Sequence, residues 1–302
     1  MTSQDISTIN PVNPALRRLG FLETDRIVII HTDDIGVCEA SVSGADELWN
    51  AGVISSSTTM VPCAWFPAAA ALCRARPQID MGVHLTLTSE WDSLRWGPIS
   101  TCDPASGLLD AEGYFYRGYT DCVEHGQLDA VLAEADAQVA RVIAAGIQPT
   151  HIDSHMGTAL APKFVAAYGH LAVKYHLPLF FPRAIALASP HAGRGLSAEE
   201  LHLARQQVAA LEAQGVALVD HYDGTSLGNH ADKPGEIKQQ LLQLRPGITH
   251  FVLHPAKDTP ELRAMAPDWR ARVAEYEALR DSALTDWIHE QGIHVIGYRA
   301  LI

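Results

Sequence analysis

Segments with an apolar, strand-like pattern alternate along the chain with segments of helical periodicity. The first begins at Arg26, where Ile27-Val28-Ile29-Ile30 forms a continuous apolar run bounded by polar residues. Such a run indicates a strand covered on both faces, as in a parallel sheet. Seven further strand-like segments follow, at 53–60, 79–87, 150–154, 177–181, 216–222, 248–253 and 293–298.

Helical segments lie between these strands. The clearest covers 128–145, where apolar residues recur on one helical face. The other predicted helices cover 41–51, 67–76, 163–175, 197–214, 233–244 and 268–291. This alternation favours a (β/α) barrel, distorted or regular, with seven or eight mostly parallel strands and outer helices. A doubly wound open sheet is the alternative.

The chain reads as one catalytic domain over 1–302, since no internal repeat or interdomain linker interrupts it. Residues 1–20 form an N-terminal extension. Residues 88–128 contain Gly, Pro and aromatic residues but no clean period. We expect this stretch to be a long loop excursion over the active-site face, because long loops in compact domains are often functional.

Composition narrows the function classes. The net charge of −13 argues against nucleic acid or an anionic membrane as a partner. The five cysteines include no C-x-x-C pair, so we expect small buried hydrophobes in a reducing cytoplasm. No signal-like segment opens the chain and no apolar run is long enough to span a membrane, which also predicts a cytoplasmic protein. The sequence is compatible with either a monomer or a homodimer.

Two adjacent carboxylates, Asp33 and Asp34, stand at the end of the first strand. Their charges repel each other and resist desolvation, and a divalent cation would relieve that cost. The pair therefore suggests a metal ligand with a base beside it. The alternative is a turn in which an aspartate caps the next helix.

Titratable residues also follow five later strands: His84, the run His151-Ile152-Asp153-Ser154-His155, Arg183, the run Asp220-His221-Tyr222-Asp223, and His254. Because barrel enzymes carry their chemistry at the carboxyl ends of the strands, this pattern predicts an active site there. Two imidazoles and a carboxylate would leave open positions on a catalytic metal. The alternative is a hydrogen bond from Asp153 to a histidine that only orients a strand end.

These motifs resemble the YdjC-like carbohydrate deacetylases, the group that includes chitooligosaccharide deacetylase. The resemblance covers about 26–300 in order and rests on Asp33-Asp34-Ile35-Gly36, 52–60, 82–88, 150–155, Leu253-His254-Pro255 and the tail 276–299. It implies a distorted β/α barrel, a divalent metal held by one Asp and two His, and hydrolysis of acetyl groups from N-acetylated sugars.

Carried over by position, the resemblance implies Asp34, His84 and His155 as metal ligands, with His151 as a rival to His155. It implies Asp33 as the general base, and His254 as a general acid or a stabiliser of the developing oxyanion. Arg183 would lie in the substrate pocket. We further assign Asp153 and Trp91 to substrate binding, where Trp91 could stack on sugar rings; a small core beneath the long loop is the alternative for Trp91.

The chain departs from the family pattern in one place. Relatives commonly continue the fourth motif as D-S-H-x-H, whereas here Met156 and Gly157 follow His155 and no further histidine is present. This puts chitooligosaccharide itself in doubt as substrate and keeps a catalytically impaired sugar-binding relative as an alternative. A metal-dependent phosphoesterase or a non-sugar amidase on the same scaffold is another. Nitrogen and oxygen ligands favour one zinc ion, whereas the family suggests magnesium.

Overall fold

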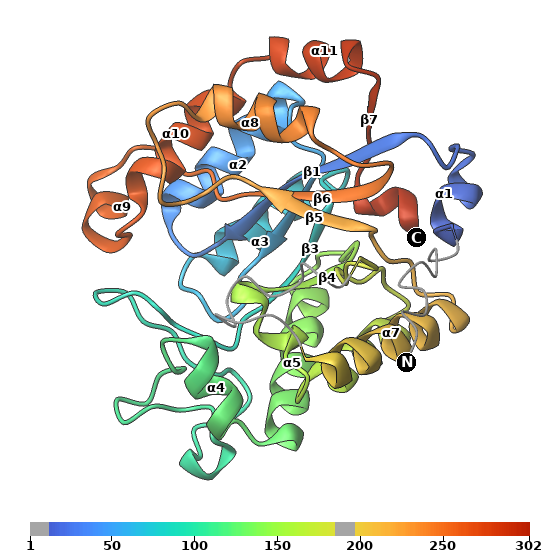
Figure 1. The fold of residues 1–302 in the computed structure, drawn as a ribbon. Helices are drawn as coiled ribbons and strands as arrows, with labels where there is room; N and C mark the ends of the chain where they lie inside the picture. The colour runs from blue at the N-terminus through green and yellow to red at the C-terminus, as the bar shows by residue number, and fades with distance from the viewer. Residues whose placement is uncertain (1–11, 185–196) are drawn as a thin grey trace.

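A parallel sheet of seven strands forms the centre of the computed structural model, which describes residues 12–184 and 197–302. The strand order is β4-β3-β2-β1-β6-β5, and β7 pairs with the first residues of β1. All of these pairings are parallel. The strands are β1 (Arg26–Ile35), β2 (Ser56–Thr59), β3 (Met81–Leu85), β4 (Ile152–Ser154), β5 (His221–Gly224), β6 (Gly247–Leu253) and β7 (Ile293–Val295) (Figure 1).

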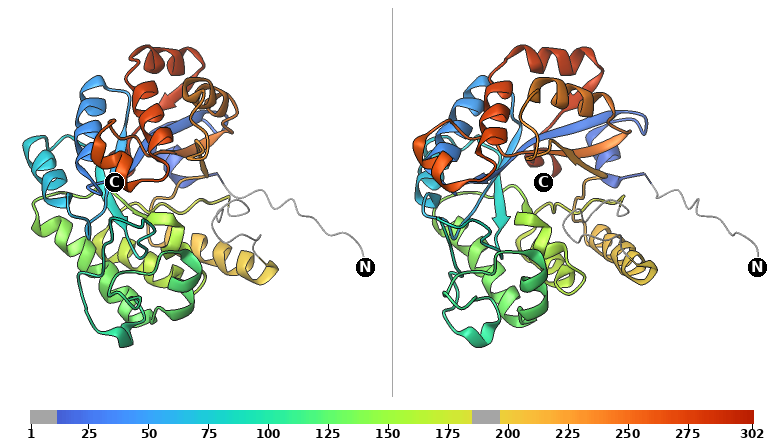
Figure 2. Two further views of the ribbon diagram at one scale, coloured as in Figure 1. Left: turned by 90° about the vertical axis from the view of Figure 1, so that its left-hand side faces the viewer. Right: turned by 60° about the vertical axis from the view of Figure 1, so that its left-hand side comes forward.

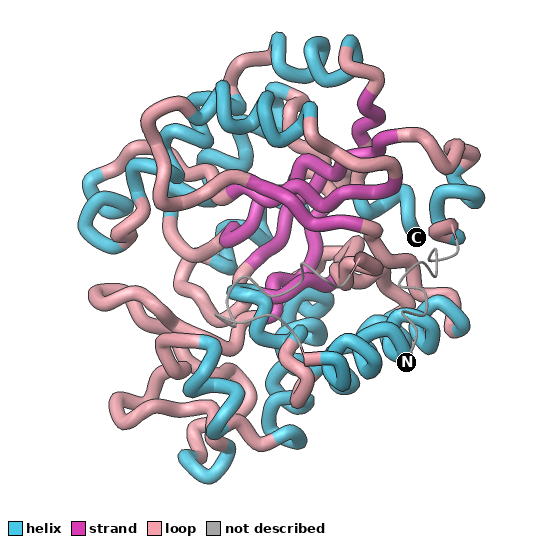
Figure 3. The backbone as a smooth tube through the Cα atoms, in the orientation of Figure 1, coloured by secondary structure: helices cyan, strands magenta, loops and turns pink. Residues whose placement is uncertain are grey.

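The sheet curls until its two edges approach each other. Leu179 forms single parallel bridges with Ile152, at the β4 edge, and with Leu218, just before β5. The backbone N–H groups of Arg183 and Ala184 also donate to the carbonyls of Val219 and Asp220, 2.9 and 3.0 Å away, so irregular pairing joins the two edges on that side. The expected distorted (β/α) barrel is therefore confirmed. Figure 3 shows the strands gathered at the centre with helices around them.

Helices surround the sheet on its outer side (Figures 1 and 2). They are α1 (Pro14–Leu19), α2 (Glu39–Ala51), α3 (Phe66–Ala75), α4 (Tyr119–His125), α5 (Leu128–Ala144), α6 (Val165–Tyr175), α7 (Ala198–Ala213), α8 (Lys233–Leu242), α9 (Pro260–Met265), α10 (Trp269–Leu279) and α11 (Ala283–Glu290).

The apolar run of β1 is buried on both faces, as the sequence predicts. Val28 and Ile30 face outward and join a core with Leu241 of α8 and other outer-helix residues. Ile27 and Ile29 face inward and pack with a group that includes Tyr298. Because successive strand residues alternate, His31 and Asp33 follow Ile29 on the inner face. Strand alternation thus carries polar side chains from the apolar floor of the barrel up to its mouth.

The predicted strand at 177–181 is wrong in extent, because only the bridges of Leu179 form there. Pro178 lies within this segment and Pro182 directly follows it, and proline has no N–H to continue a ladder of hydrogen bonds. The predicted strand at 216–222 is also wrong in extent, because the observed strand β5 begins only at His221.

The single predicted helix at 268–291 is also wrong, since it divides into α10 and α11. The side chain of Asp281 accepts a hydrogen bond from the backbone N–H of Ala283, 3.0 Å away, which starts a new helix after a turn. The final strand ends at Val295, and a short 3₁₀ helix, Tyr298–Leu301, follows it.

The excursion at 88–128 is mostly irregular, with α4 and a 3₁₀ turn (Pro104–Ser106) as its regular parts. It is attached to the fold through Glu134 of α5, whose carboxylate accepts hydrogen bonds from the backbone N–H groups of Ile99 and Ser100. A long loop with fixed anchors is thereby held beside the barrel mouth.

Four of the five cysteines, Cys38, Cys63, Cys73 and Cys122, are buried, and all five are free thiols. No helix among residues 12–184 and 197–302 combines the length and apolar character needed to cross a bilayer. The first eleven residues of the expected N-terminal extension lie outside the described residues; α1 follows them and buries Ala15 and Leu16 against the barrel.

Candidate metal centre and active site

Three strand ends bring a carboxylate and two imidazoles together at the barrel mouth. Asp34 lies near the end of β1, His84 lies in β3, and His155 is the first residue after β4. The three atoms that face one another are Asp34 Oδ1, His84 Nε2 and His155 Nδ1. Their separations are 3.3 Å for Asp34–His84, 3.2 Å for Asp34–His155 and 3.3 Å for His84–His155.

These separations fit one shared ion. For metal–ligand bonds of about 2.1 Å, neighbouring ligand atoms lie about 3.0 Å apart in an octahedron and about 3.4 Å apart in a tetrahedron. The observed distances lie between the two values. In addition, Asp34 Oδ1 is buried and has no hydrogen-bond partner among the described residues. A buried oxygen left without a partner beside two imidazole nitrogens is what a metal site requires.

Each imidazole is held from behind by a carboxylate. His84 Nδ1 lies 2.7 Å from Asp153 Oδ1, and His155 Nε2 lies 2.9 Å from Glu90 Oε2. These hydrogen bonds favour the tautomers in which lone pairs point toward Asp34. Carboxylate–histidine pairs of this kind commonly orient the ligands of protein metal sites.

Asp34 is held in the same way by Arg272 of α10, whose Nη1 donates to Asp34 Oδ2 at 2.8 Å. Arg272 in turn pairs with Asp268 at 2.8 Å and lies over the ring of Trp91. This leaves Oδ1 of Asp34 free to face the histidines. The carboxylate is therefore oriented as a ligand through one oxygen.

The charges around the three groups favour a cation between them. Burial acts to raise the pKa of Asp34, but the Arg272 guanidinium together with His155 and His84 outweighs burial and holds that pKa well below its usual range. Burial acts to lower the pKa of His155, but Glu90 and Asp34 outweigh it and raise it to about 9. The pKa of His84 is raised by Asp153 and Asp33 against the effect of burial. A site that draws protons onto its imidazoles offers the same attraction to a metal ion.

The backbone at the end of β1 is bent to present Asp34. Its φ is +63°, a left-handed conformation that is uncommon for a residue other than glycine. Gly36 follows with φ of +98°, and a Cβ there would lie 3.2 Å from both Phe66 and Thr59. The Asp-Asp-x-Gly motif thus specifies a turn that only a glycine at its last position accommodates.

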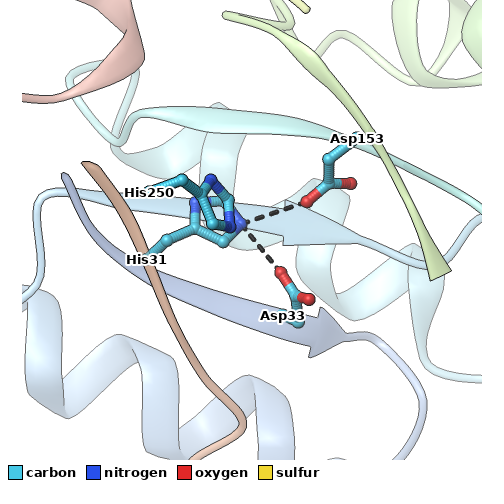
Figure 4. Close-up of side chains that lie close together, drawn as sticks. All are labelled: His31, Asp33, Asp153 and His250. Carbon is cyan, nitrogen blue, oxygen red and sulfur yellow. Dashed lines mark ion pairs between the residues drawn. The ribbon is translucent and has the colours of Figure 1, made fainter. Parts of the chain in front are cut away.

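Asp33 lies beside the three candidate ligands, with its Oδ2 3.8 Å from His84 Nε2 and 3.8 Å from His254 Nε2. Its other oxygen, Oδ1, is 2.9 Å from His31 Nε2. His31 also lies 3.2 Å from Asp153 Oδ2, so one buried imidazole joins the two carboxylates. Figure 4 shows both carboxylates directed at His31, with the ring of His250 beside it.

Burial acts to lower the pKa of His31, but its hydrogen bonds to Asp153 and Asp33 outweigh burial and raise that pKa to about 9. Its Nε2 faces both carboxylates, whereas its Nδ1 is buried with no hydrogen-bond partner among the described residues. The Nε2–H of His31 thus fixes Oδ1 of Asp33 and leaves Oδ2 directed toward the cavity.

His254 follows β6 and lines the cavity, as expected from its position after a strand. Its backbone N–H donates to Glu275 Oε2 at 2.6 Å, which fixes the start of the loop. Glu275 is fully buried with Lys233, whose Nζ lies 3.4 Å from its Oε1. A buried ion pair beneath the wall thus positions His254 opposite Asp33.

His151, the rival ligand, lies away from the three candidate ligands. Its ring stacks on Tyr298 with centroids 3.7 Å apart, and it is completely buried. Four strand-like residues span about 13 Å, so His151 lies well below His155 in the barrel. Gly82 makes room for it, since a Cβ there would lie 2.5 Å from the ring. The structure therefore favours His155 over His151.

Of the three residues assigned to substrate binding, Asp153 and Trp91 line the main cavity and Arg183 does not. The guanidinium of Arg183 pairs with Glu212 and Asp220. Asp153 lines the cavity, but its oxygens are bound by His84 and His31. Trp91 is 3% exposed and is covered by Arg272, which fits the alternative of a small core better than an open stacking surface.

The three candidate ligands come together without the further histidine that the family resemblance led us to expect. The corresponding position is Gly157, which has φ of +63° and lines the cavity. Met156 also has a positive φ, so the chain turns sharply after His155. This turn directs His155 toward Asp34 once the strand has ended.

Three supporting residues were not predicted: His31, Glu90 and Arg272. Alternation with Asp33 in the same strand is a signal that could have identified His31. Glu90 stands next to Trp91 in an irregular loop, and Arg272 is 238 positions from Asp34, so no local pattern marks either one.

Comparison with known proteins places these residues in a family. A family model described as YdjC-like protein matches residues 27–290. A carbohydrate deacetylase of Thermus thermophilus is 31% identical over 289 residues, which cover 95% of this chain and 97% of that protein. A chitooligosaccharide deacetylase of Yersinia enterocolitica is 30% identical over 162 residues, covering 53% of this chain and 60% of that protein.

Among solved structures, a proposed cellobiose-phosphate cleavage protein of Enterococcus faecalis V583 is similar over almost the whole chain. The TM-score is 0.74 at 27% identity, with 92% of this chain and 99% of that chain covered. The fold is therefore shared with a protein whose name mentions a phosphorylated sugar.

A pH titration of stability tests the charge of His31. Replacement by Gln should lower the free energy of unfolding by on the order of 3 kcal/mol below pH 6.5, since a pKa raised from 6.5 to about 9 stabilises the folded protonated form. The difference should shrink as pH rises from 6.5 to 9. Urea unfolding at pH 6, 7.5 and 9.5 measures it, with the exposed His289→Gln as control. A difference that does not change with pH would contradict the assignment.

Proposed function

Since the chain belongs to the YdjC-like protein family, we propose that it is a metal-dependent carbohydrate deacetylase that removes acetyl groups from N-acetylated sugars. The observation that carries the proposal is the convergence of Asp34, His84 and His155 at the mouth of a large cavity. Similarity over 95% of the chain to a protein named carbohydrate deacetylase supports the substrate class.

The ligand set proposed is Asp34 Oδ1, His84 Nε2 and His155 Nδ1. Two nitrogens and one oxygen favour zinc, because magnesium prefers oxygen ligands; magnesium remains the family's suggestion. When bound here, a divalent ion would polarise an acetyl carbonyl and make a water molecule more acidic.

Asp33 is proposed as the general base. Its Oδ1 is occupied by His31, and its Oδ2 faces the cavity next to the candidate ligands. Water adds to the acetyl carbon and gives up a proton to Asp33. Because Asp33 is adjacent to Asp34 in the chain, the base would lie within reach of a water molecule bound between the candidate ligands.

His254 is proposed as the general acid. It stands across from Asp33, with 3.8 Å between its Nε2 and Asp33 Oδ2, and its side chain remains partly exposed to the cavity. As the carbon–nitrogen bond breaks, the Nε2–H of His254 donates a proton to the departing sugar nitrogen. The products are acetate and an amino sugar, and protons and bonds balance over the two steps.

An acetate-release screen combined with metal analysis tests the function. We expect acetate from N-acetylated mono- or oligosaccharides and about one divalent ion per chain. Phosphate release from a generic ester without acetate would support the phosphoesterase alternative, and acetate from non-sugar amides alone would support an amidase. Sugar binding by metal-loaded protein without any acetate release would support an impaired relative.

Asp33→Asn tests the base. The variant should keep its metal, because Asp33 is outside the proposed ligand set, and its kcat should fall about 100- to 10,000-fold. Acetate release is compared with metal content in the same preparation. Full turnover by a metal-loaded variant would refute the role of Asp33.

Glu90→Gln tests the support of His155. Loss of the carboxylate behind the imidazole should weaken metal affinity about 10- to 100-fold, without removing a ligand. Competition with a chromogenic chelator measures the affinity. Asp92→Asn is the matched control, since Asp92 is two residues away with a side chain that is 98% exposed. Equal affinities for the Glu90 variant and the wild type would argue against the ligand assignment.

A further inference from the structure

Thr58 of β2 lies among the buried polar groups beneath the proposed metal centre. Successive residues of β2 alternate between the two faces of the sheet, and Ser57 bonds outward to Trp49 of α2, so Thr58 points into the barrel. Thr58 is fully buried and does not line the cavity. Its hydroxyl oxygen lies between 2.9 and 3.3 Å from polar atoms of four residues on β1, β3 and β4: His31, Asp33, His84 and Asp153.

Two of these residues, Asp33 and Asp153, compete for one donor on His31. The Nε2–H of His31 lies 2.9 Å from Asp33 Oδ1 and 3.2 Å from Asp153 Oδ2, and both oxygens are directed at it (Figure 4). A single N–H forms one strong hydrogen bond, whereas a shared N–H forms two weaker ones. A buried carboxylate oxygen without a donor of its own is costly. The arrangement of Asp33 and Asp153 therefore requires a second donor.

The hydroxyl of Thr58 supplies that donor. It lies 2.9 Å from Asp153 Oδ2 and 3.3 Å from Asp33 Oδ1, so its single proton is better placed for Asp153. His31 then keeps its Nε2–H for Asp33. The other oxygen of Asp153, Oδ1, lies 2.7 Å from His84 Nδ1. Three carboxylate oxygens thus have three separate donors.

This distribution of donors matters because the two carboxylates support different parts of the site. When Oδ1 of Asp33 is held, its Oδ2 faces the cavity. When Asp153 is held, His84 keeps the orientation in which its Nε2 points toward Asp34. Without the hydroxyl of Thr58, Asp153 would turn to share the Nε2–H of His31. Asp33 would then lose its fixed orientation, and the hydrogen bond that orients His84 would weaken.

We propose that Thr58 is a positioning residue for both the proposed base and the proposed metal site. It gives Asp153 a donor of its own, and it thereby reserves the N–H of His31 for Asp33. The inference rests on the proposed deacetylase function where it concerns Asp33, and on the proposed ligand set where it concerns His84. Thr58 acts through these neighbours, since it does not line the cavity itself.

Thr58→Val tests the hydroxyl, because valine has nearly the same shape and no donor. We expect kcat for acetate release to fall about 10- to 100-fold, since a hydrogen bond to a buried charged group is lost. KM should change less than about threefold, because no group in the cavity is removed. Zinc affinity, measured by competition with a chromogenic chelator, should fall about threefold or more.

Two further variants serve as the rescue and the control. Thr58→Ser restores the donor and should recover most of the loss in kcat and in zinc affinity. Thr249→Val is the matched control, because Thr249 is also a buried strand residue and its hydroxyl has no partner among the described residues. The control should keep the kcat and the zinc affinity of the wild type.

The pair Thr58→Ser and Thr58→Ala keeps the proposal testable if the valine variant does not fold, because serine and alanine differ by one oxygen atom. The serine variant should exceed the alanine variant in both kcat and zinc affinity. Equal values for serine and alanine, or wild-type values for alanine or valine, would overturn the proposal.

A double-mutant comparison tests whether Thr58 acts through Asp33. In an Asp33→Asn background the orientation of the base no longer matters, so Thr58→Val should lower the residual kcat far less than it does in the wild type. Its effect on zinc affinity should persist, because that effect passes through Asp153 and His84. An undiminished loss of kcat in the Asp33→Asn background would contradict the positioning of the base.

The two readouts separate this inference from the proposed function. If the wild type binds zinc but releases no acetate from any N-acetylated sugar, the deacetylase proposal fails, and the zinc affinities of the Thr58 variants still decide the inference. If the wild type releases acetate and the valine and alanine variants equal it in kcat and zinc affinity, the deacetylase proposal stands and the inference fails. Absence of zinc binding by the wild type would remove both.

Discussion

The site depends on the approach of Asp34 Oδ1, His84 Nε2 and His155 Nδ1 to within 3.3 Å of one another. Each group is held by an oppositely charged or acidic partner: Arg272, Asp153 and Glu90. Buried groups of this kind stay together only when their charges are compensated. The ring of supporting residues therefore orients the proposed ligands and draws positive charge to the space between them.

The barrel explains why these residues meet. Parallel strands end at the same edge, so β1, β3 and β4 deliver their last residues to one place. The inner face of β1 changes from Ile27 and Ile29 to His31 and Asp33 over a few residues. The left-handed backbone conformation of Asp34 then turns its carboxylate away from that of Asp33. Asp33 and Asp34 are thus adjacent in the chain but have different partners, His31 for Asp33 and Arg272 for Asp34. They also have different proposed roles.

The sequence was sufficient for the barrel and for the residues at its strand ends, because alternation and apolar runs report directly on a buried parallel sheet. It was not sufficient for the strand at 177–181, where two prolines limit pairing, or for the turn that divides α10 from α11. Arg183 was assigned to the pocket by its position after a strand, yet local ion pairs direct it elsewhere. Arg272 and Glu90 depend on contacts between distant segments, which no local pattern encodes.

One divalent ion is proposed to bind between Asp34, His84 and His155, and every proposed catalytic role depends on it. Diffraction from crystals grown with zinc, with data collected on both sides of the zinc absorption edge, tests this most directly. We expect a single strong anomalous peak about 2.0–2.2 Å from Asp34 Oδ1, His84 Nε2 and His155 Nδ1. Zinc bound elsewhere, or no ordered zinc while these three side chains keep their positions, would contradict it.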